Sequence, residues 1–327
     1  MQEDVKKAIL QTLAYGDIFD YPLTKEEIWK FLISSEKIKK KNFEEALEIL
    51  SLRDKHNLSK QSFNSNRIAA SSRSSGLLAM TDQDGQSNLY HLPKRSEIIS
   101  KRIKREKESW KKLEIACKIA SILSVIPTIY LIGISGGVSM RNSDKNDDID
   151  LFVVTKKNTL WVTRITLLIF LEVLGYRRKR TDKKVADKIC LNMLLDKDAI
   201  KMPKERQDLY SAHEVVQMLP VFVRNDMYRK FINANKDWVK RFLPNAINRG
   251  KTINITQERK NFLLSVFLSP VLHLLVVNYL AKQLQLWFIR KHQTTEFVKD
   301  NFLAFHPFEY KNFVLKEYNK RLKKYEI

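Results

Sequence analysis

Two aspartates separated by a single residue, Asp148 and Asp150, open the apolar run 149–154. Because side chains of a strand alternate between its two faces, these carboxylates are expected to point to the same side. Neighbouring carboxylates repel each other unless a cation lies between them, and Mg²⁺ prefers one or two carboxylates together with waters and substrate phosphates. The spacing therefore predicts a site for Mg²⁺ or Mn²⁺ where a strand begins.

A glycine pair precedes these aspartates by about ten residues: Ser135-Gly136-Gly137 ends an earlier apolar run, and the polar loop 138–147 follows. Glycine allows a backbone to approach a ligand closely, and its N–H groups can face phosphate oxygens. Taken alone, a glycine pair after a strand is more often an ordinary turn. Taken alone, Asp-X-Asp is also a solvated strand end or the metal motif of sugar-nucleotide glycosyltransferases. Together they indicate nucleotidyl transfer.

The combined motif resembles that of the nucleotidyltransferases of the DNA polymerase β superfamily. Their signature is an apolar residue, Gly, then Gly or Ser, about ten residues, and Asp-apolar-Asp-apolar, and the resemblance covers residues 113–200. It implies a small mixed sheet backed by helices. It also implies a nucleoside triphosphate held at Gly136 and Gly137, with a hydroxyl from Ser135 or Ser139, and Mg²⁺ held by the Asp pair.

Family members commonly add a third carboxylate from a later strand, and here the next predicted strand is 188–195, after a helix at 160–175. Its one polar interior residue is Asn192, at the position where the resemblance implies a catalytic Asp or Glu. An amide is not a general base near neutral pH. Asp187 and Asp196 flank the strand and would replace it if the register differs. The alternatives are an enzyme that uses one metal ion and a nucleotide-binding domain without catalysis.

Residues 1–93 have a different character. Helical periodicity over 5–14, a capping box at Thr24 and Glu27, and a helix over 42–54 precede a predicted hairpin of 77–80 and 89–92. Three helices and a hairpin resemble a winged helix, with a Ser-rich insertion at 59–76. The third helix is rich in Glu, which repels phosphate, so protein contact and substrate presentation compete with DNA reading as its role.

A long charged helix over 94–124 leads into the domain predicted at 94–200, and the remainder, 201–327, is predicted to be entirely helical. Within it, residues 262–281 are apolar over a length that suits a transmembrane helix, so a membrane-anchored protein is one alternative. Pro270, His273 and Asn278 interrupt this run, which favours a helix buried in a bundle.

Composition bounds the function classes. The 327 residues contain 59 Lys and Arg against 37 Asp and Glu, a formal charge of +22. Such a surplus suits nucleic acid, nucleotides or an anionic membrane, although a solvated basic surface gives the same sum. The run 177–184 connects the predicted helix to the predicted strand 188–195, so its Lys and Arg residues are candidates for contact with the triphosphate or with an acceptor. Only two cysteines occur, which predicts a reduced, cytoplasmic protein without a disulfide framework or a zinc site.

The sequence thus predicts an α+β fold: a polymerase β-like mixed sheet with helices between a winged-helix-like module and a helical C-terminal region. The predicted function is Mg²⁺-dependent transfer of a nucleoside monophosphate from NTP to a hydroxyl of a nucleic acid, small molecule or protein. A catalytically silent, DNA-associated nucleotide-binding regulator is the main alternative.

Overall fold

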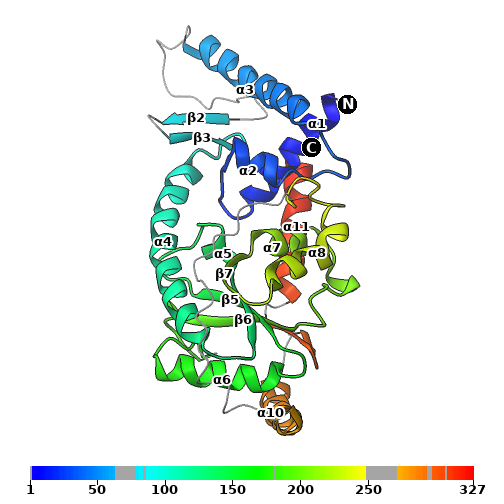
Figure 1. Cartoon of the computed structure of the whole chain (residues 1–327). Coiled ribbons are helices and arrows are strands. Elements are labelled where there is room, and N and C mark those ends of the chain that lie inside the picture. The colour runs from blue at the N-terminus through cyan, green and yellow to red at the C-terminus, as the bar shows by residue number, and fades with distance from the viewer. Residues whose placement is uncertain are drawn as a thin grey trace. The chain divides into compact units, whose positions relative to one another are not determined.

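The structure is a computed structural model, and it describes residues 2–62, 79–83, 86–179, 181–247, 271–292, 297–305 and 308–327. The chain is a mixed α+β protein that groups into two compact units (Figure 1). Unit 1 contains the described residues of Met1–Lys104, Trp238–Asn248 and Phe313–Ile327. Unit 2 contains those of Arg105–Asp237 and Arg249–Asn312. The functional division at residues 93 and 200 stays a prediction.

Unit 1 follows the predicted order of helices and hairpin. Its elements are α1 (Gln2–Asp17), β1 (Leu23–Thr24), α2 (Lys25–Lys30), α3 (Lys40–Ser62), β2 (Ala79–Gln83) and β3 (Gln86–His91). The strands form an antiparallel sheet in the order β1-β3-β2. The turn of the predicted hairpin at Asp84-Gly85 and most of the Ser-rich insertion lie outside the described residues.

The start of α2 confirms the predicted capping box. The Thr24 hydroxyl accepts a bond from the Glu27 N–H at 3.2 Å, and the Glu27 carboxylate accepts from the Thr24 N–H at 2.9 Å. Arg102, buried in the same unit, donates to both Glu27 carboxylate oxygens at 2.7 and 2.9 Å. Two backbone donors at the helix start are thereby satisfied, and a charged partner holds the cap in place.

Unit 2 is built on a six-stranded mixed sheet in the order β7-β4-β5-β6-β9-β8. The strands are β4 (Ile129–Ser135), β5 (Ile149–Thr155), β6 (Ile189–Asp196), β7 (Leu219–Val223), β8 (Phe297–Lys299) and β9 (Phe302–Ala304). Strands β5 and β6 are parallel, and every other neighbouring pair is antiparallel. Helix α6 (Leu160–Val173) connects the parallel pair, as a crossover connection requires.

Alternation along β4 and β5 separates the two faces of this sheet. Ile134, Leu151 and Val153 belong to the large apolar core that also contains α6 and the second half of α4 (Glu97–Leu123). The opposite face carries Ser135 and Phe152, and helices α7 (Leu209–Gln217) and α8 (Met227–Val239) supply side chains that pack over it. In Figure 1, α6 and α7 lie on opposite sides of the β5 and β6 arrows.

The prediction that 201–327 is entirely helical is wrong. Helices α7 (Leu209–Gln217) and α8 (Met227–Val239) overlap the helices expected at 210–218 and 225–242, and α10 (Val271–His292) and α11 (Phe308–Lys324) follow. However, β7, β8 and β9 extend both edges of the sheet. Pro220 argues against a central strand, but β7 is an edge strand, where the lost donor is tolerated. β8 and β9 have three residues each, too few to show a periodicity.

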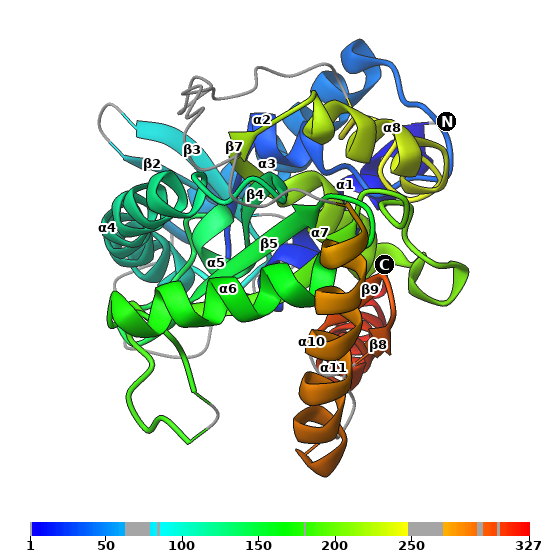
Figure 2. The same ribbon diagram turned by 60° about the horizontal axis from the view of Figure 1, so that its bottom comes forward.

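Within the described part of the chain, no helix is long and apolar enough to cross a membrane. Residues 271–281 of the apolar run belong to α10, and 262–270 lie outside the described residues. One face of α10 packs on α6 (Figure 2). The Asn278 side chain accepts there from two free N–H groups of the α6 N-terminus at 3.0 and 3.1 Å. Leu280, within the apolar run, is 60 % exposed, so the described part of this run is not buried throughout, as was expected for a helix in a bundle.

Candidate functional site

The two aspartates predicted to bind metal lie side by side where β5 begins. Asp148 immediately precedes the strand, and Asp150 pairs with Cys190 of the neighbouring β6. One ligand atom from each of Asp148, Asp150 and Cys190 lies within 4.8 Å of the other two. The alternation of a strand therefore brings the carboxylates together, and the parallel neighbour adds a thiol that the sequence analysis did not select.

The glycine turn comes directly against this acidic strand end. Gly136 starts the one-turn helix α5 (Gly136–Ser139) with φ +64°, a conformation that side-chain-bearing residues rarely adopt. A Cβ atom at Gly136 would lie 2.5 Å from the Asp150 carboxylate oxygen. At Gly137 the added atom would lie 3.3 Å from the Asn142 carbonyl. The first glycine is thus required by both its backbone angle and the closeness of Asp150.

The loop between the glycines and the aspartates is fixed from α4 by polar side chains. Lys112 is 1 % exposed, and its ammonium donates to the carbonyls of Lys145 and Asp147 at 3.1 and 2.7 Å and to the Asp187 carboxylate at 2.8 Å. The Ser109 hydroxyl accepts from the Ser143 N–H at 2.9 Å. A buried ammonium that is fully used in this way positions the backbone leading into Asp148.

Within the basic run, one side chain reaches the acidic pair. Arg178 donates to the Asp148 carboxylate at 2.5 Å and interacts with Cys190 as well. Arg177 and Lys179 instead pair with Glu172 at 3.1 and 2.6 Å. The exposed Lys183 and Lys184 remain predictions for phosphate or acceptor contact, and Arg180 lies outside the described residues. The Arg178 guanidinium therefore supplies a positive charge beside the two adjacent carboxylates, which would otherwise repel each other.

Cys190 does not extend the pair into a three-ligand site for a hard cation. Burial raises the pKa of the Cys190 thiol well above its usual range, and the charges of Asp150 and Asp148 raise it further. The thiolate is the metal-binding form of cysteine, and soft sulfur does not suit Mg²⁺ or Mn²⁺. The donor set that fits a hard cation is therefore Asp148 with Asp150.

Asn192 lies in a β-bulge of β6. Leu151 pairs with Leu191 and Phe152 with Met193, so Asn192 is the extra residue between two registered pairs. Bulges redirect side chains beside functional sites. The Asn192 side chain is 1 % exposed, and its amide N–H donates to the Ser135 hydroxyl at 3.1 Å, while its amide oxygen has no partner among the described residues.

The flanking aspartates do not replace Asn192. Asp187 accepts from Lys112 at 2.8 Å. Asp196 pairs with Thr155 at the far end of β5, six residues along β6 from Cys190 and roughly 20 Å away at 3.3 Å per residue. Its carboxylate, whose pKa burial raises, accepts from the Asn158 and Asp198 N–H groups. Asp196 thus lies far from the acidic pair, and Asp187 is not among the groups gathered within 4.8 Å around Asp148 and Asp150.

Ser135 and Ser139, the two predicted nucleotide-binding serines, differ in surroundings. Ser135 is buried, is paired across the sheet with Asp150, and accepts the bond from Asn192. The hydroxyl of Ser139 donates to the Gly136 carbonyl at 2.8 Å within the glycine turn. Ser135 thus connects the acidic strand end to the bulge, whereas Ser139 stabilises the turn itself.

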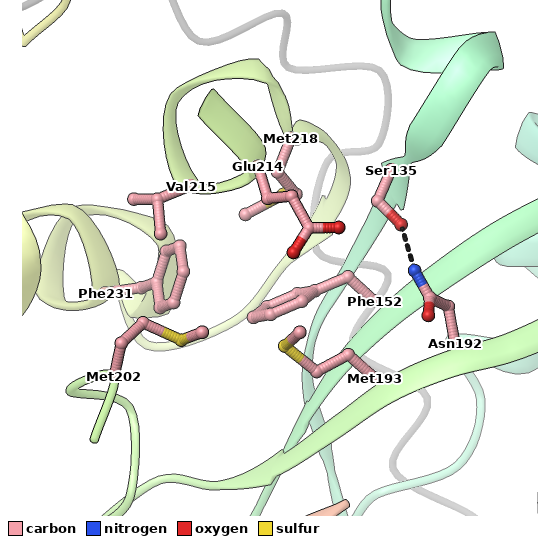
Figure 3. Close-up of a pocket in the computed structure, with 9 residues that line it drawn as sticks. All are labelled: Ser135, Phe152, Asn192, Met193, Met202, Glu214, Val215, Met218 and Phe231. Atoms are coloured by element: carbon pink, nitrogen blue, oxygen red, sulfur yellow. Dashed lines mark hydrogen bonds between the residues drawn. The ribbon is translucent and has the colours of Figure 1, made fainter. Parts of the chain in front are cut away.

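A small pocket opens beside Ser135 and Asn192 (Figure 3). Its wall is mainly apolar, and the cavity measures about 20 Å³. The lining residues are Ser135, Phe152, Asn192, Met193, Met202, Glu214, Val215, Met218 and Phe231. Glu214, from α7, points toward Ser135 and Asn192. One of its carboxylate oxygens accepts from the Tyr210 hydroxyl at 3.1 Å, and the other is buried without a partner among the described residues.

Sequence reasoning missed Glu214, Cys190 and Arg178 as site residues. Cys190 was identifiable, since it lies at the residue of β6 that a parallel pairing places opposite Asp150. Arg178 was part of a recognised basic run but could not be separated from its neighbours. Glu214 carried no signal, because it belongs to an amphipathic helix in which only the tertiary fold shows the direction of each side chain.

Comparison with known proteins adds no relative to this geometry. No protein-family model, curated protein or solved structure matches the chain. The functional argument therefore depends on the residues of unit 2 themselves.

Proposed function

We propose that unit 2 contains a nucleotidyltransferase domain of the DNA polymerase β type. The observation that supports this proposal is the pairing of Asp148 and Asp150 at the start of β5, against a glycine turn in which a Cβ atom on Gly136 would lie 2.5 Å from the Asp150 carboxylate. An adjacent carboxylate pair and a close-approach backbone are the two features that the phosphates and the metal of an NTP require.

The residues present fit Mg²⁺ or Mn²⁺ as the ion. Asp148 and Asp150 offer hard oxygen ligands within 4.8 Å of each other, and substrate phosphates and waters complete such sites. A bound divalent ion would neutralise charge on the triphosphate. The protein residues would hold the triphosphate at the Gly136–Gly137 turn and orient it for in-line attack by an acceptor hydroxyl.

The balanced reaction is nucleoside monophosphate transfer. The acceptor hydroxyl gives up its proton to a base and its oxygen bonds to the α-phosphorus, while the bond from that phosphorus to the bridging oxygen breaks and pyrophosphate leaves with the bonding electrons. The N-terminal module, proposed to be a winged helix from its helix and hairpin order, would then contact the acceptor or a partner protein. The positive charge of the chain supports a polyanionic ligand, either the NTP itself or nucleic acid.

The test is transfer of label from α-labelled NTP. All four nucleotides are supplied with Mg²⁺ or Mn²⁺ and a cell extract as the acceptor source, and wild type is compared with the Asp148→Asn/Asp150→Asn double variant. We expect labelled product from the wild type alone, with at least a ~10³-fold loss in the variant, because several kcal/mol of metal-derived stabilisation are removed. Equal labelling by both proteins would disprove the proposal.

A second candidate is a nucleotide-binding regulator without catalysis. It is favoured by the ion pair of Arg178 with Asp148, which already supplies a cation, and by an amide at Asn192 in place of a third carboxylate. Metal-dependent NTP binding without any transfer product, together with salt-sensitive binding to duplex DNA, would select this candidate.

A further inference from the structure

The pocket beside the acidic strand end contains two buried hydrogen-bond acceptors that lack donors. They are the Asn192 amide oxygen and one Glu214 carboxylate oxygen, neither of which has a partner among the described residues. Leaving such a group unsatisfied costs roughly 1–3 kcal/mol, and more when the group is charged. Two of them lining one small pocket therefore indicate an occupant that brings hydrogen-bond donors.

The pocket and the acidic pair share one face of the sheet. Ser135 stands directly across from Asp150, and directly opposed residues of antiparallel strands have Cβ atoms about 4.5–5.5 Å apart. Asn192 donates to Ser135, and Phe152, two residues after Asp150, lines the pocket wall. Tyr310 lies within electrostatic reach of both places: partial burial raises the pKa of its hydroxyl, and the charges of Glu214 and Asp150 add to that shift.

We propose that this pocket receives the acceptor hydroxyl and that Glu214 takes its proton, replacing the carboxylate that β6 lacks. This assignment rests on the proposed nucleotidyl transfer. The hydroxyl oxygen bonds to the α-phosphorus, its proton passes to the unpartnered Glu214 oxygen, and pyrophosphate leaves with the electrons of the broken bond. Asn192 accepts a hydrogen bond from the acceptor and orients it.

The dimensions and lining of the pocket also define the acceptor class. A cavity of about 20 Å³ has room for one group the size of a water molecule, so it takes the reacting hydroxyl rather than a ring. Among the residues that the structure describes, its lining contains a carboxylate, an amide, a hydroxyl and apolar side chains, but no Lys or Arg. An anionic group next to the reacting hydroxyl would be repelled by Glu214. The acceptor is therefore a neutral or cationic alcohol.

The test measures pyrophosphate release from NTP and Mn²⁺ with three small alcohols of similar size: 2-aminoethanol, ethylene glycol and glycolate. Nucleotide binding is measured separately by calorimetry. We expect the wild type to use the cationic and neutral alcohols well and glycolate poorly. Glu214→Gln should bind NTP normally but release pyrophosphate 10²–10⁴-fold more slowly, the usual loss when a proton acceptor is removed. Tyr210→Phe, which keeps the carboxylate and removes its hydroxyl partner, should change the rate far less.

Each other result contradicts the inference. If Glu214→Gln released pyrophosphate at the wild-type rate, proton transfer to Glu214 would be excluded. Equal use of the three alcohols by the wild type would exclude the acceptor class, even if the Gln variant failed to fold. Metal-dependent binding of NTP without release from any alcohol would overturn this assignment while leaving nucleotide binding intact. NTP binding separates the two proposals. If NTP binds to the wild type and to Glu214→Gln but not to the Asp148→Asn/Asp150→Asn protein, the proposed nucleotide site holds even when the role of Glu214 fails.

Discussion

The acidic strand end and the neighbouring pocket are built from the same strands but have opposite hydrogen-bond balances. At the strand end, Arg178 donates to Asp148, so a cationic donor is present beside the carboxylates. In the pocket, Asn192 and Glu214 line a small cavity, and each has a buried oxygen without a donor among the described residues. The acidic strand end is stable without a ligand because Arg178 supplies a cation. The pocket has unmatched acceptors, which a ligand with hydrogen-bond donors would satisfy.

The two regions suit different parts of the proposed reaction. Negative charge balanced by Arg178 suits an ion-dependent triphosphate site, because a metal and its phosphates can take over the role of the guanidinium. Unmatched acceptors suit a hydroxyl that must lose a proton. Changing one region without the other separates these roles.

The largest expected loss of stability comes from adding a methyl group against Asp150. Gly136→Ala imposes a left-handed backbone on alanine and places its Cβ 2.5 Å from the Asp150 carboxylate. Gly175→Ala is the matched control, since Gly175 has φ +75° but no atom within 4 Å of an added Cβ. The control should lose about 1–2 kcal/mol of unfolding free energy from the backbone alone. Gly136→Ala should lose more and should also bind NTP at least about tenfold more weakly.

Denaturant unfolding and calorimetric NTP binding measure both effects. Equal losses of stability in the two variants, with unchanged binding in Gly136→Ala, would show that Asp150 moves away freely and that the close approach has no role.

A smaller effect is expected on the pH dependence of stability, from His213 in α7. His213, the neighbour of Glu214, is buried, and burial lowers the pKa of its imidazole from 6.5 to about 3. The folded protein therefore favours neutral His213: this stability is present above pH 6.5 and is lost as the pH falls toward 3. At about 1.4 kcal/mol per pKa unit, unfolding free energy should fall by about 2 kcal/mol between pH 7 and pH 5 from this group.

The His213→Gln variant isolates that contribution. Its unfolding free energy should change less with pH over the same interval, by roughly the amount assigned to the imidazole. Parallel curves for wild type and variant would mean that His213 is solvated or charged in the folded protein.

The sequence predicted the parts of the fold that are encoded locally. The α2 cap follows from Thr24 and Glu27 alone, and β5 follows from an apolar run preceded by Asp148. The edge strands β8 and β9 were missed because their conformation comes from pairing, β9 with β6 and β8 with β9, rather than from their own residues. Burial and pairing across long separations decide such elements.

The residues of the candidate site also differ in whether local sequence predicts them. Asp148 and Asp150 are separated by one residue, so strand alternation alone brings them together. Glu214 lies 64 positions after Asp150, and nothing in α7 marks which of its side chains faces the sheet. The setting of Asn192 depends on a bulge, since a regular register would have paired Asn192 with Phe152. Such contacts follow from the assembled sheet.

The smallest expected effect tests whether Arg178 stands in for the metal. Arg178 is 41 % exposed on its side chain, and a pair of this kind contributes at most about 1 kcal/mol. Arg178→Gln should therefore bind Mn²⁺ alone up to about fivefold more tightly, because a competing cation is removed from Asp148. Arg177→Gln is the matched control, since Arg177 pairs with Glu172 and should leave Mn²⁺ affinity unchanged. Weaker Mn²⁺ binding in Arg178→Gln would mean that the guanidinium holds Asp148 in its ligating position, and the ion pair would then be part of the metal site rather than its competitor.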